Sequence, residues 1–298
     1  MPYNKAAWIP SKTAPFEVGD APVPEPEANE VVIRVHAVAI NPVDAYIQSM
    51  GIIVEKYPAT VGCDCAGDVV TVGSDVKNFK PGDRVLAALD MTGNRPNAGA
   101  FQFYACAFAA VTAKLPEGIS YTEGCVLPLG FCTAAMAMFA KDQLALEHYP
   151  QLETLKSNGQ VVLIWGGSSS VGSCGIQLAK AAGYEVAVTC SAHNLEYCKD
   201  AGADYVFDHK KESVVQDIVS ALGGKSFAGV FDTVFPADTI VKSADIAHQL
   251  GGRKHVATVM IGLGPQVVPE GLPEDVTTSY CRSSCLPSNT RRIELRDG

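Results

Sequence analysis

Residues 161–191 constrain the fold of this chain more than any other stretch, and they read VVLIWGGSSSVGSCGIQLAKAAGYEVAVTCS. Val161–Trp165 is an apolar run of the kind that forms a strand buried on both faces. The small residues 166–172 predict a tight turn, after which a helix extends to Gly183. Glu185–Cys190 is predicted to be a second strand. The order strand, turn, helix and strand indicates a βαβ unit of a parallel sheet.

The turn has the chemistry of a dinucleotide-binding loop. A pyrophosphate binds to the free N–H groups at a helix N-terminus, and the main chain can approach it only where side chains are small. In the fingerprint G-x-G-x-x-G, Gly167 and Gly172 occupy the first and last places and Ser169 occupies the middle one. The Ser169 hydroxyl can donate a hydrogen bond to a phosphate oxygen. We therefore predict dinucleotide binding; the alternative is an ordinary turn rich in Gly and Ser.

The residues that follow the second strand favour NADP(H) over NAD(H). An NAD site usually places an Asp or Glu about 20 residues beyond the glycines, where it binds the ribose 2′-hydroxyl. This chain has Ser191, Ala192, His193 and Asn194 there, without an acid. Ser, His and Asn can all donate to a 2′-phosphate, which a carboxylate would repel. The alternative is that Ser191 or Asn194 only caps the next helix.

The composition argues against several classes of function. The 298 residues are 47% hydrophobic and 18% charged, which is enough apolar material for a large core. The net charge of −9 argues against nucleic-acid binding, because phosphate recognition requires a basic face. The sequence predicts neither a membrane-spanning segment nor a signal peptide, so we expect a cytoplasmic protein.

The ten cysteines lack the spacing of a metal site. Structural zinc needs four converging ligands, and neither Cys63-x-Cys65 nor Cys281-x3-Cys285 has a second pair or a nearby His. Most of the cysteines lie in apolar stretches, where Cys acts as a small buried side chain. We therefore predict neither a bound metal nor a disulfide framework.

The chain divides into three stretches of different texture. Residues 1–125 are rich in short strands separated by turns, which predicts a partly open barrel of antiparallel strands. Residues 126–264 alternate strands and helices, which predicts a doubly wound parallel sheet. Residues 265–298 show no clear periodicity and are expected to form an atypical, poorly ordered tail.

Several short motifs occur in a fixed order together with the fingerprint. They are N-P-V-D at 41–44, G-C-D-C-A-G-D-V at 62–69, V-G at 72–73, F-K-P-G-D-R-V at 79–85 and L-P-L-G-F-C-T-A at 127–134. This series resembles the medium-chain dehydrogenase/reductase superfamily, and most of all its zinc-independent quinone-reductase and enoyl-reductase branch. The pairing of GGSSSVG with TCSAHN is similar to the fungal group that includes trans-acting enoyl reductases of polyketide pathways.

The resemblance implies an α/β protein with a GroES-like catalytic domain and a Rossmann domain that is C-terminally shortened. It implies NADPH-dependent reduction of an activated C=C bond or of a quinone. Zinc-dependent relatives carry a Cys near the position of Asn41 and Gly-His-Glu where this chain has Gly62-Cys63-Asp64, so we expect no zinc. Relatives also continue well beyond Met260 and return to the catalytic domain. Without that return we expect part of the catalytic domain's core to be exposed.

The resemblance also implies roles for individual residues. Cofactor binding is expected of Asn41, Pro42, Val43, Asp44, Thr258 and Val259 beside the nicotinamide, of Ser168, Ser169, Ser170, Val171 and Gly172 at the pyrophosphate, and of Ser191, Ala192, His193, Asn194 and His209 at the 2′-phosphate. Substrate is expected to contact Leu127, Pro128, Leu129, Gly130, Phe131, Cys132, Thr133 and Ala134. For several of these residues the alternative is a plain turn, a helix cap or a surface side chain.

The proton donor has more than one candidate. Some enoyl reductases of the superfamily place a Tyr after the N-P-x-D motif, where this chain has Ile52. Tyr46 lies nearby at a different spacing, and packing is its alternative role. Tyr46 and Thr133 are the candidate catalytic residues, and water is the alternative donor.

These observations predict an NADPH-dependent oxidoreductase that reduces an enoyl or enone double bond in polyketide or toxin biosynthesis. Its substrate is a small molecule or a carrier-bound enoyl group, a polyketide or peptide synthase is a candidate partner, and the protein is expected to be a monomer or homodimer. The alternatives are a quinone reductase, a catalytically impaired NADPH-binding protein, or the unstable product of a shifted or mis-spliced reading frame.

Overall fold

The structure is a computed structural model that describes residues 3–90, 92, 95, 98–151, 157–235, 237–260 and 269–282. The described residues form two compact units. The first ends at Leu129 and the second begins at Gly130, whereas the sequence placed the boundary after residue 125. The segment Val126–Leu129 therefore belongs to the first unit.

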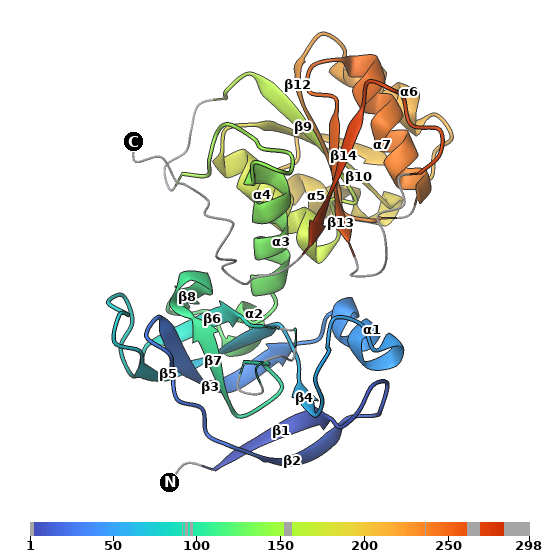
Figure 1. Cartoon of the computed structure of the whole chain (residues 1–298). Coiled ribbons are helices and arrows are strands. Elements are labelled where there is room, and N and C mark those ends of the chain that lie inside the picture. Colours follow the sequence, from blue (N-terminus) through green and yellow to red (C-terminus); the bar gives the residue numbers. More distant parts are fainter. Residues whose placement is uncertain are drawn as a thin grey trace. The chain divides into compact units, whose positions relative to one another are not determined.

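The first unit consists of two antiparallel sheets (Figure 1). The smaller sheet has the strand order β2 (Glu17–Ala21), β1 (Asn4–Ile9) and β4 (Ala59–Thr60). The larger sheet has the order β7 (Tyr104–Phe108), β3 (Glu30–Ala39), β5 (Asp64–Val72), β6 (Arg84–Ala88) and β8 (Thr112–Lys114). Two short helices, α1 (Pro42–Met50) and α2 (Tyr121–Gly124), and the 3₁₀ turn Ala109–Val111 complete the described part. The antiparallel pairing confirms the prediction for this half of the chain.

The second unit contains one parallel sheet of six strands (Figure 1). Its order is β11 (Tyr205–Asp208), β10 (Glu185–Cys190), β9 (Gln160–Trp165), β12 (Ser226–Asp232), β13 (His255–Met260) and β14 (Thr277–Arg282). Numbered along the chain from β9, this is the order 3-2-1-4-5-6 of a doubly wound dinucleotide-binding fold. The prediction of a doubly wound parallel sheet is confirmed.

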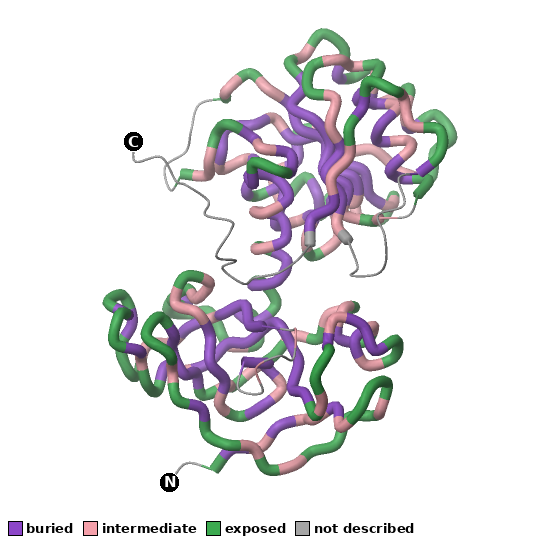
Figure 2. The backbone as a smooth tube through the Cα atoms, in the orientation of Figure 1, coloured by how far each residue is buried: buried purple, intermediate pink, exposed green. Residues whose placement is uncertain are grey.

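Helices cover both faces of this sheet because the side chains of a strand alternate between the faces. Val162 and Ile164 of β9 pack in a cluster with residues of α3 (Pro128–Phe139), α4 (Ser170–Ala181) and α5 (Leu195–Asp200). Leu163 and Trp165 pack in a second cluster with residues of α6 (Val214–Leu222) and α7 (Ala237–Leu250). The central strands are buried between these two layers (Figure 2).

Strand β14 corrects the prediction that the chain beyond residue 265 is poorly ordered. It pairs in parallel with β13 over six residue pairs, from His255 opposite Thr277 to Met260 opposite Arg282. β14 supplies the sixth strand of the sheet, which the sequence analysis did not predict. Residues 283–298 of the predicted tail lie outside the described part of the chain.

The sequence analysis did not predict β14, because Thr277 and Ser279 on one of its faces carry hydroxyls in place of large apolar groups. The His255 ring contacts both of them, with Nδ1 2.7 Å from Thr277 Oγ1 and Nε2 2.8 Å from Ser279 Oγ. Ser279 Oγ also donates to Gln143 Oε1 at 3.0 Å. Tyr280 and Cys281 are the buried side chains of the strand. In β14, hydrogen bonds between polar side chains thus take the place of the alternating apolar residues from which a strand is usually predicted.

The segment Tyr121–Phe139 differs from the expectation that no stretch reaches membrane-spanning length. By length and composition alone this segment could cross a membrane. Of its most apolar stretch of 18 residues, 56% is buried inside the protein. Residues 125–127 within it are not helical, so it consists of α2 and α3 separately. Core helices of soluble proteins pass the same test.

The His255 contacts predict a pH-dependent stability of the second unit. Burial, together with the smaller effect of the Arg253 charge, lowers the pKa of His255 to about 4. The unfolded side chain titrates near 6.5, so the unfolded state binds more protons in this interval and stability falls as pH drops from 6.5 to 4. His255→Gln, which cannot titrate, is expected to weaken this loss in thermal unfolding followed between about pH 7 and pH 4. An unchanged pH dependence in the variant would contradict this role of His255.

Candidate functional site

The glycine-rich turn after β9 is held close to both neighbouring elements. The N–H groups of Gly166 and Gly167 donate to the carbonyl oxygen of Thr189 on β10, at 3.1 and 2.9 Å. A Cβ atom at Gly172 would lie 2.2 Å from the carbonyl oxygen of Gly166. No side chain fits there, so the first turn of α4 lies directly against the end of β9. This close approach is the purpose of the last glycine of the fingerprint.

The N-terminus of α4 keeps free N–H groups for an anion. The Ser169 hydroxyl accepts a hydrogen bond from Gly172 N at 2.9 Å and donates to the Gly166 carbonyl oxygen at 2.9 Å. It therefore caps the helix, whereas we expected it to donate to a phosphate. The N–H groups of Ser170 and Val171 belong to the first turn, where no intrahelical acceptor exists. These two N–H groups and the helix dipole can bind a pyrophosphate. Ser168 lies in the turn just before them.

Thr233 is a part of this site that the sequence analysis missed. Its hydroxyl contacts the carbonyl oxygens of Trp165 and Gly166, each at 3.0 Å, and lies 3.0 Å from Ser169 Oγ. It follows Asp232, the buried last residue of β12. The signal was present in the sequence, because polar residues directly after an apolar strand mark the carboxyl edge of a parallel sheet.

Asp232 shapes the turn beside the same edge. Its Oδ1 accepts from the N–H of Val234 at 2.8 Å, and its Oδ2 accepts from Thr239 Oγ1 at 2.7 Å. Burial raises its pKa, which these hydrogen bonds partly offset. Thr258 on β13 lies opposite Asp232 in the sheet register and is fully buried, and Val259 follows it. The predicted residues Thr258 and Val259 therefore lie on the strand next to β12, one strand away from the switch point of the strand order between β9 and β12.

The predicted 2′-phosphate residues gather at the ends of β10 and β11. Ser191 Oγ lies 3.2 Å from Nε2 of His209, the residue that follows β11. Ala192, His193 and Asn194 form a 3₁₀ turn directly after Ser191. The exposed Lys210 and Lys211 follow His209. The sequence analysis did not include these two lysines among the site residues. The charges of the two lysines lie between those of Asp208 and Glu212 in the sequence.

The predicted substrate segment Leu127–Ala134 spans the boundary of the two units, so only its second half lies with the nucleotide residues. A Cβ atom at Gly130 would lie 2.8 Å from Ser170 Oγ, which places the start of α3 beside the start of α4. The Thr133 hydroxyl is buried without a hydrogen-bond partner among the described residues. Phe131 is half exposed, Cys132 is partly buried and Ala134 is part of the core. In the first unit, Leu127 is exposed and Pro128 is buried.

A buried carboxylate connects the two predicted site segments of the first unit. Asp64 at the start of β5 is 1% exposed. Its Oδ2 accepts from Asn41 Nδ2 at 2.9 Å and its Oδ1 accepts from Leu129 N at 2.7 Å. Burial raises the pKa of Asp64 to about 6, against the lowering effect of these hydrogen bonds. The sequence analysis used Asp64 only to argue against zinc and missed this role.

Asp44 is a second buried carboxyl group near Asn41. Its Oδ2 accepts from Asn41 N at 2.7 Å and fixes the start of α1, where Pro42 and Val43 form the first turn. Its Oδ1 is buried without a partner among the described residues. Burial raises the pKa of Asp44 to about 6. Tyr46 lies two residues after Asp44 on α1 and is half-buried. No described residue forms a hydrogen bond with its hydroxyl.

The described residues contain no group of three His, Cys, Asp or Glu side chains that could hold a metal ion. The nine cysteines among them form no disulfide with one another, and all except Cys132 are buried. Cys63, in the motif that carries ligands in zinc-dependent proteins, donates from Sγ to the carbonyl oxygen of Leu89 at 3.3 Å. Cys285 lies outside the described residues.

Comparison with known proteins assigns both units. Residues 27–137 match the family model described as "Alcohol dehydrogenase GroES-like domain", and residues 170–275 match the one described as "Zinc-binding dehydrogenase". The dehydrogenase pigH of Monascus ruber is 43% identical over 279 residues, which cover 91% of this chain and 74% of that protein. The trans-enoyl reductase himH of Aspergillus japonicus is 38% identical over 280 residues, covering 93% of this chain and 78% of that protein.

A solved structure matches this chain over most of its length. The Escherichia coli quinone oxidoreductase complexed with NADPH matches this chain with a TM-score of 0.64 at 26% identity. The match covers 87% of this chain and 73% of that one.

The contact between Gly172 and Gly166 predicts a large effect of a single methyl group. Gly172→Ala is expected to lower the free energy of unfolding by about 1–3 kcal/mol, because main-chain atoms must move to admit the Cβ. Gly175→Ala is the matched control on the same helix, where the new Cβ would meet the side chains of Ile164 and Phe231 at 3.3 and 3.4 Å. Chemical denaturation should show the larger loss for Gly172→Ala. Equal effects would contradict the main-chain contact.

The Asp64 hydrogen bonds predict a second destabilising substitution. Asp64→Asn places an NH₂ group opposite one of two donors, Asn41 Nδ2 or Leu129 N–H. The expected loss of unfolding free energy is about 1–3 kcal/mol. Asp68→Asn on the same strand is the control, since that side chain is one third exposed, and a loss below about 1 kcal/mol is expected. Chemical denaturation of both variants tests this difference, and a loss no larger for Asp64→Asn than for Asp68→Asn would argue against the bridging role.

Proposed function

This chain belongs to the medium-chain dehydrogenase/reductase superfamily, and we propose that it uses NADPH to reduce an activated carbon–carbon double bond. Membership makes it an oxidoreductase with a GroES-like and a Rossmann unit. The observation that carries the proposal is the edge of the parallel sheet, where a helix N-terminus without side-chain obstruction lies beside polar groups suited to a 2′-phosphate.

The residues present fit a phosphorylated nicotinamide dinucleotide. The N–H groups of Ser170 and Val171 would hold the pyrophosphate, as the absence of a Cβ at Gly172 allows. Ser191 and His209 would bind the 2′-phosphate, and no carboxylate follows β10 to repel it. When bound, NADPH supplies the hydride, and the protein supplies binding and orientation.

The substrate is proposed to be an α,β-unsaturated carbonyl compound that accepts hydride at its β-carbon. The printed name of the Aspergillus japonicus relative, a trans-enoyl reductase, supports this class. The buried Thr133 hydroxyl has no partner among the described residues, so it is available to polarise the carbonyl oxygen as negative charge develops there. The proton is proposed to come from Tyr46, Thr133 or water. A carrier-bound enoyl group of a polyketide or peptide synthase would meet these requirements.

Quinone reduction is the second candidate, and the structural match to a quinone oxidoreductase favours it. The loss of NADPH absorbance in the presence of enones, quinones and carrier-bound enoyl thioesters separates the two. Turnover with the enoyl compounds supports the proposal, and turnover only with quinones supports the second candidate. If the folded protein binds NADPH and none of the three classes is reduced, the chain is a binding protein.

The proposed 2′-phosphate site predicts that one added carboxylate changes cofactor preference. Ser191→Asp is expected to weaken NADPH binding by about ten- to a hundredfold through charge repulsion, with little change for NADH. Ser220→Asp is the control, because that exposed side chain on α6 adds the same charge elsewhere in the unit. Titration calorimetry with both cofactors measures the ratio. Unchanged NADPH binding in Ser191→Asp would place the 2′-phosphate elsewhere.

The two candidate proton donors predict a kinetic effect. A Tyr46→Phe/Thr133→Val double variant is expected to lose about ten- to a hundredfold in kcat while still binding NADPH. Tyr197→Phe removes an exposed tyrosine hydroxyl on α5 and should leave kcat unchanged. Full turnover of the double variant would exclude both side chains and leave water as the donor.

A further inference from the structure

The Asn41 side chain is held in one orientation by a buried carboxylate. Asp64 is 1% exposed, and its Oδ2 accepts a hydrogen bond from Asn41 Nδ2 at 2.9 Å. Its Oδ1 accepts from Leu129 N at 2.7 Å, so rotation of the carboxylate would break both hydrogen bonds. An ionised carboxylate can only accept, so the amide must turn its NH₂ group towards Asp64 and not its oxygen. The two orientations of the Asn41 amide are therefore not equivalent.

One hydrogen of this amide remains for a ligand. The NH₂ group carries two hydrogens, and among the described residues Asp64 Oδ2 is the acceptor for one of them. Asn41 is only partly buried, so a ligand can reach the second hydrogen. An N–H group that is fixed by the protein is the kind of donor that stabilises negative charge on a carbonyl oxygen.

The main chain of Asn41 is held by a second buried carboxyl group. Asn41 is the N-cap of α1, and Asp44 Oδ2 accepts from its N–H at 2.7 Å. The Asp44 N–H donates to the main-chain carbonyl oxygen of Asn41 at 3.0 Å. Asp44 is 2% exposed. Hydrogen bonds thus hold both the main chain and the side chain of Asn41, as a preorganised donor requires.

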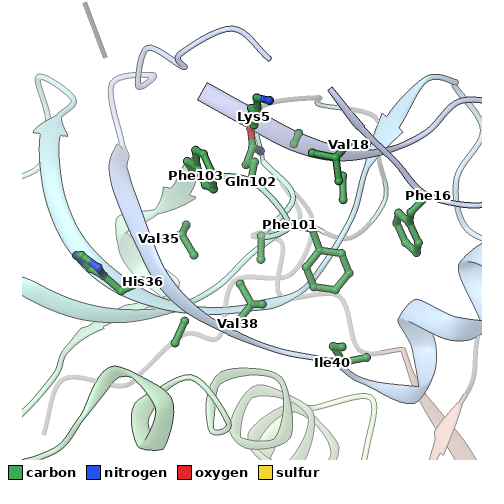
Figure 3. Close-up of a pocket in the computed structure, with 14 residues that line it drawn as sticks. Lys5, Phe16, Val18, Val35, His36, Val38, Ile40, Phe101, Gln102 and Phe103 are labelled. Carbon is green, nitrogen blue, oxygen red and sulfur yellow. The ribbon is translucent and has the colours of Figure 1, made fainter. Parts of the chain in front are cut away.

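The residue before Asn41 has a different environment. Ile40 is 81% exposed and lines an apolar hollow of the first unit, whereas Asn41 is not one of the lining residues (Figure 3). The chain thus passes from an apolar side chain at the hollow to a polar side chain held by Asp64. The Asn41 donor belongs to the hydrogen bonds of Asp64 and does not depend on the hollow.

We propose that Asp64 is a positioning residue for the reduction: it holds the Asn41 carboxamide so that the second Nδ2–H binds the carbonyl oxygen of the substrate. The inference rests on the proposed function and applies to both candidate substrate classes. Enones and quinones each accept hydride with negative charge developing on a carbonyl oxygen, which a fixed N–H stabilises. Asp64 is almost fully buried and acts through Asn41.

The test exchanges the two groups. In Asp64→Asn the new NH₂ group faces one of two donors, and kcat/KM for the reduction of cyclohex-2-en-1-one by NADPH is expected to fall about ten- to a hundredfold. If only quinones are reduced, menadione replaces the enone. Asp68→Asn on the same strand is the control, because that side chain is one third exposed and does not contact Asn41. It should keep the wild-type kcat/KM.

The double variant Asn41→Asp/Asp64→Asn separates positioning from a purely structural role. The amide at position 64 can donate to the carboxylate at position 41, and its oxygen can accept from Leu129 N, so every donor again faces an acceptor. The midpoint of thermal unfolding is expected to return towards the wild-type value. The kcat/KM is expected to stay at or below that of Asp64→Asn, because a carboxylate at position 41 has no N–H for the substrate.

A second readout does not need turnover. In NMR spectra of the isotope-labelled full chain, the two Nδ2 protons of Asn41 are identified by their loss in Asn41→Asp. The proton that binds Asp64 is expected at lower field than its partner, and this difference should shrink in Asp64→Asn. Cyclohexanone, added with NADP⁺, should shift the signal of the other proton.

Three results would overturn the proposal. They are a wild-type kcat/KM in Asp64→Asn, recovery of both the unfolding midpoint and kcat/KM in the double variant, and Asn41 amide signals that are the same in the wild type and in Asp64→Asn. If the wild type reduces neither the enone nor the quinone, the proposed function fails. The amide signals then still decide whether Asp64 positions Asn41.

Discussion

The approach of α4 to the end of β9 is the constraint on which the second unit depends. Because a Cβ at Gly172 would lie 2.2 Å from the Gly166 carbonyl oxygen, only glycine allows the helix to begin where it does. That position directs the first N–H groups of the helix, those of Ser170 and Val171, to the carboxyl edge of the sheet. The Ser169 cap and the Thr233 hydroxyl hold the turn through hydrogen bonds from two sides.

The first unit has a corresponding centre in the Asp64 carboxylate. It is almost fully buried and accepts hydrogen bonds from Asn41 and from the Leu129 N–H. Two segments far apart in the sequence are thereby held at one point, and both were predicted to line the site. A buried carboxylate is costly unless it is hydrogen-bonded, which explains why both oxygens have partners.

The sequence analysis predicted the elements that depend on a local residue pattern. It missed those that depend on contacts with residues far away in the sequence. The apolar run of β9 and the glycine-rich turn fix the βαβ unit locally, and the structure has both. Strand β14 was missed because its Thr277 and Ser279 hydroxyls are satisfied by His255, a residue more than twenty positions away. Asp64 was missed as a site residue for the same reason, since its role exists only where distant segments meet. The capping hydrogen bond of Ser169 was not predicted, because it depends on the direction of the side chain.

Hydride transfer to the β-carbon of an activated double bond is the central claim, and the position of the transferred atom tests it most directly. The full chain would reduce an α,β-unsaturated ketone with NADPH that carries deuterium on the transferable position of the nicotinamide, and the product would be examined by NMR. The account predicts a saturated ketone with deuterium on the β-carbon. Deuterium on the carbinol carbon of an unsaturated alcohol would contradict it and would make the protein a carbonyl reductase.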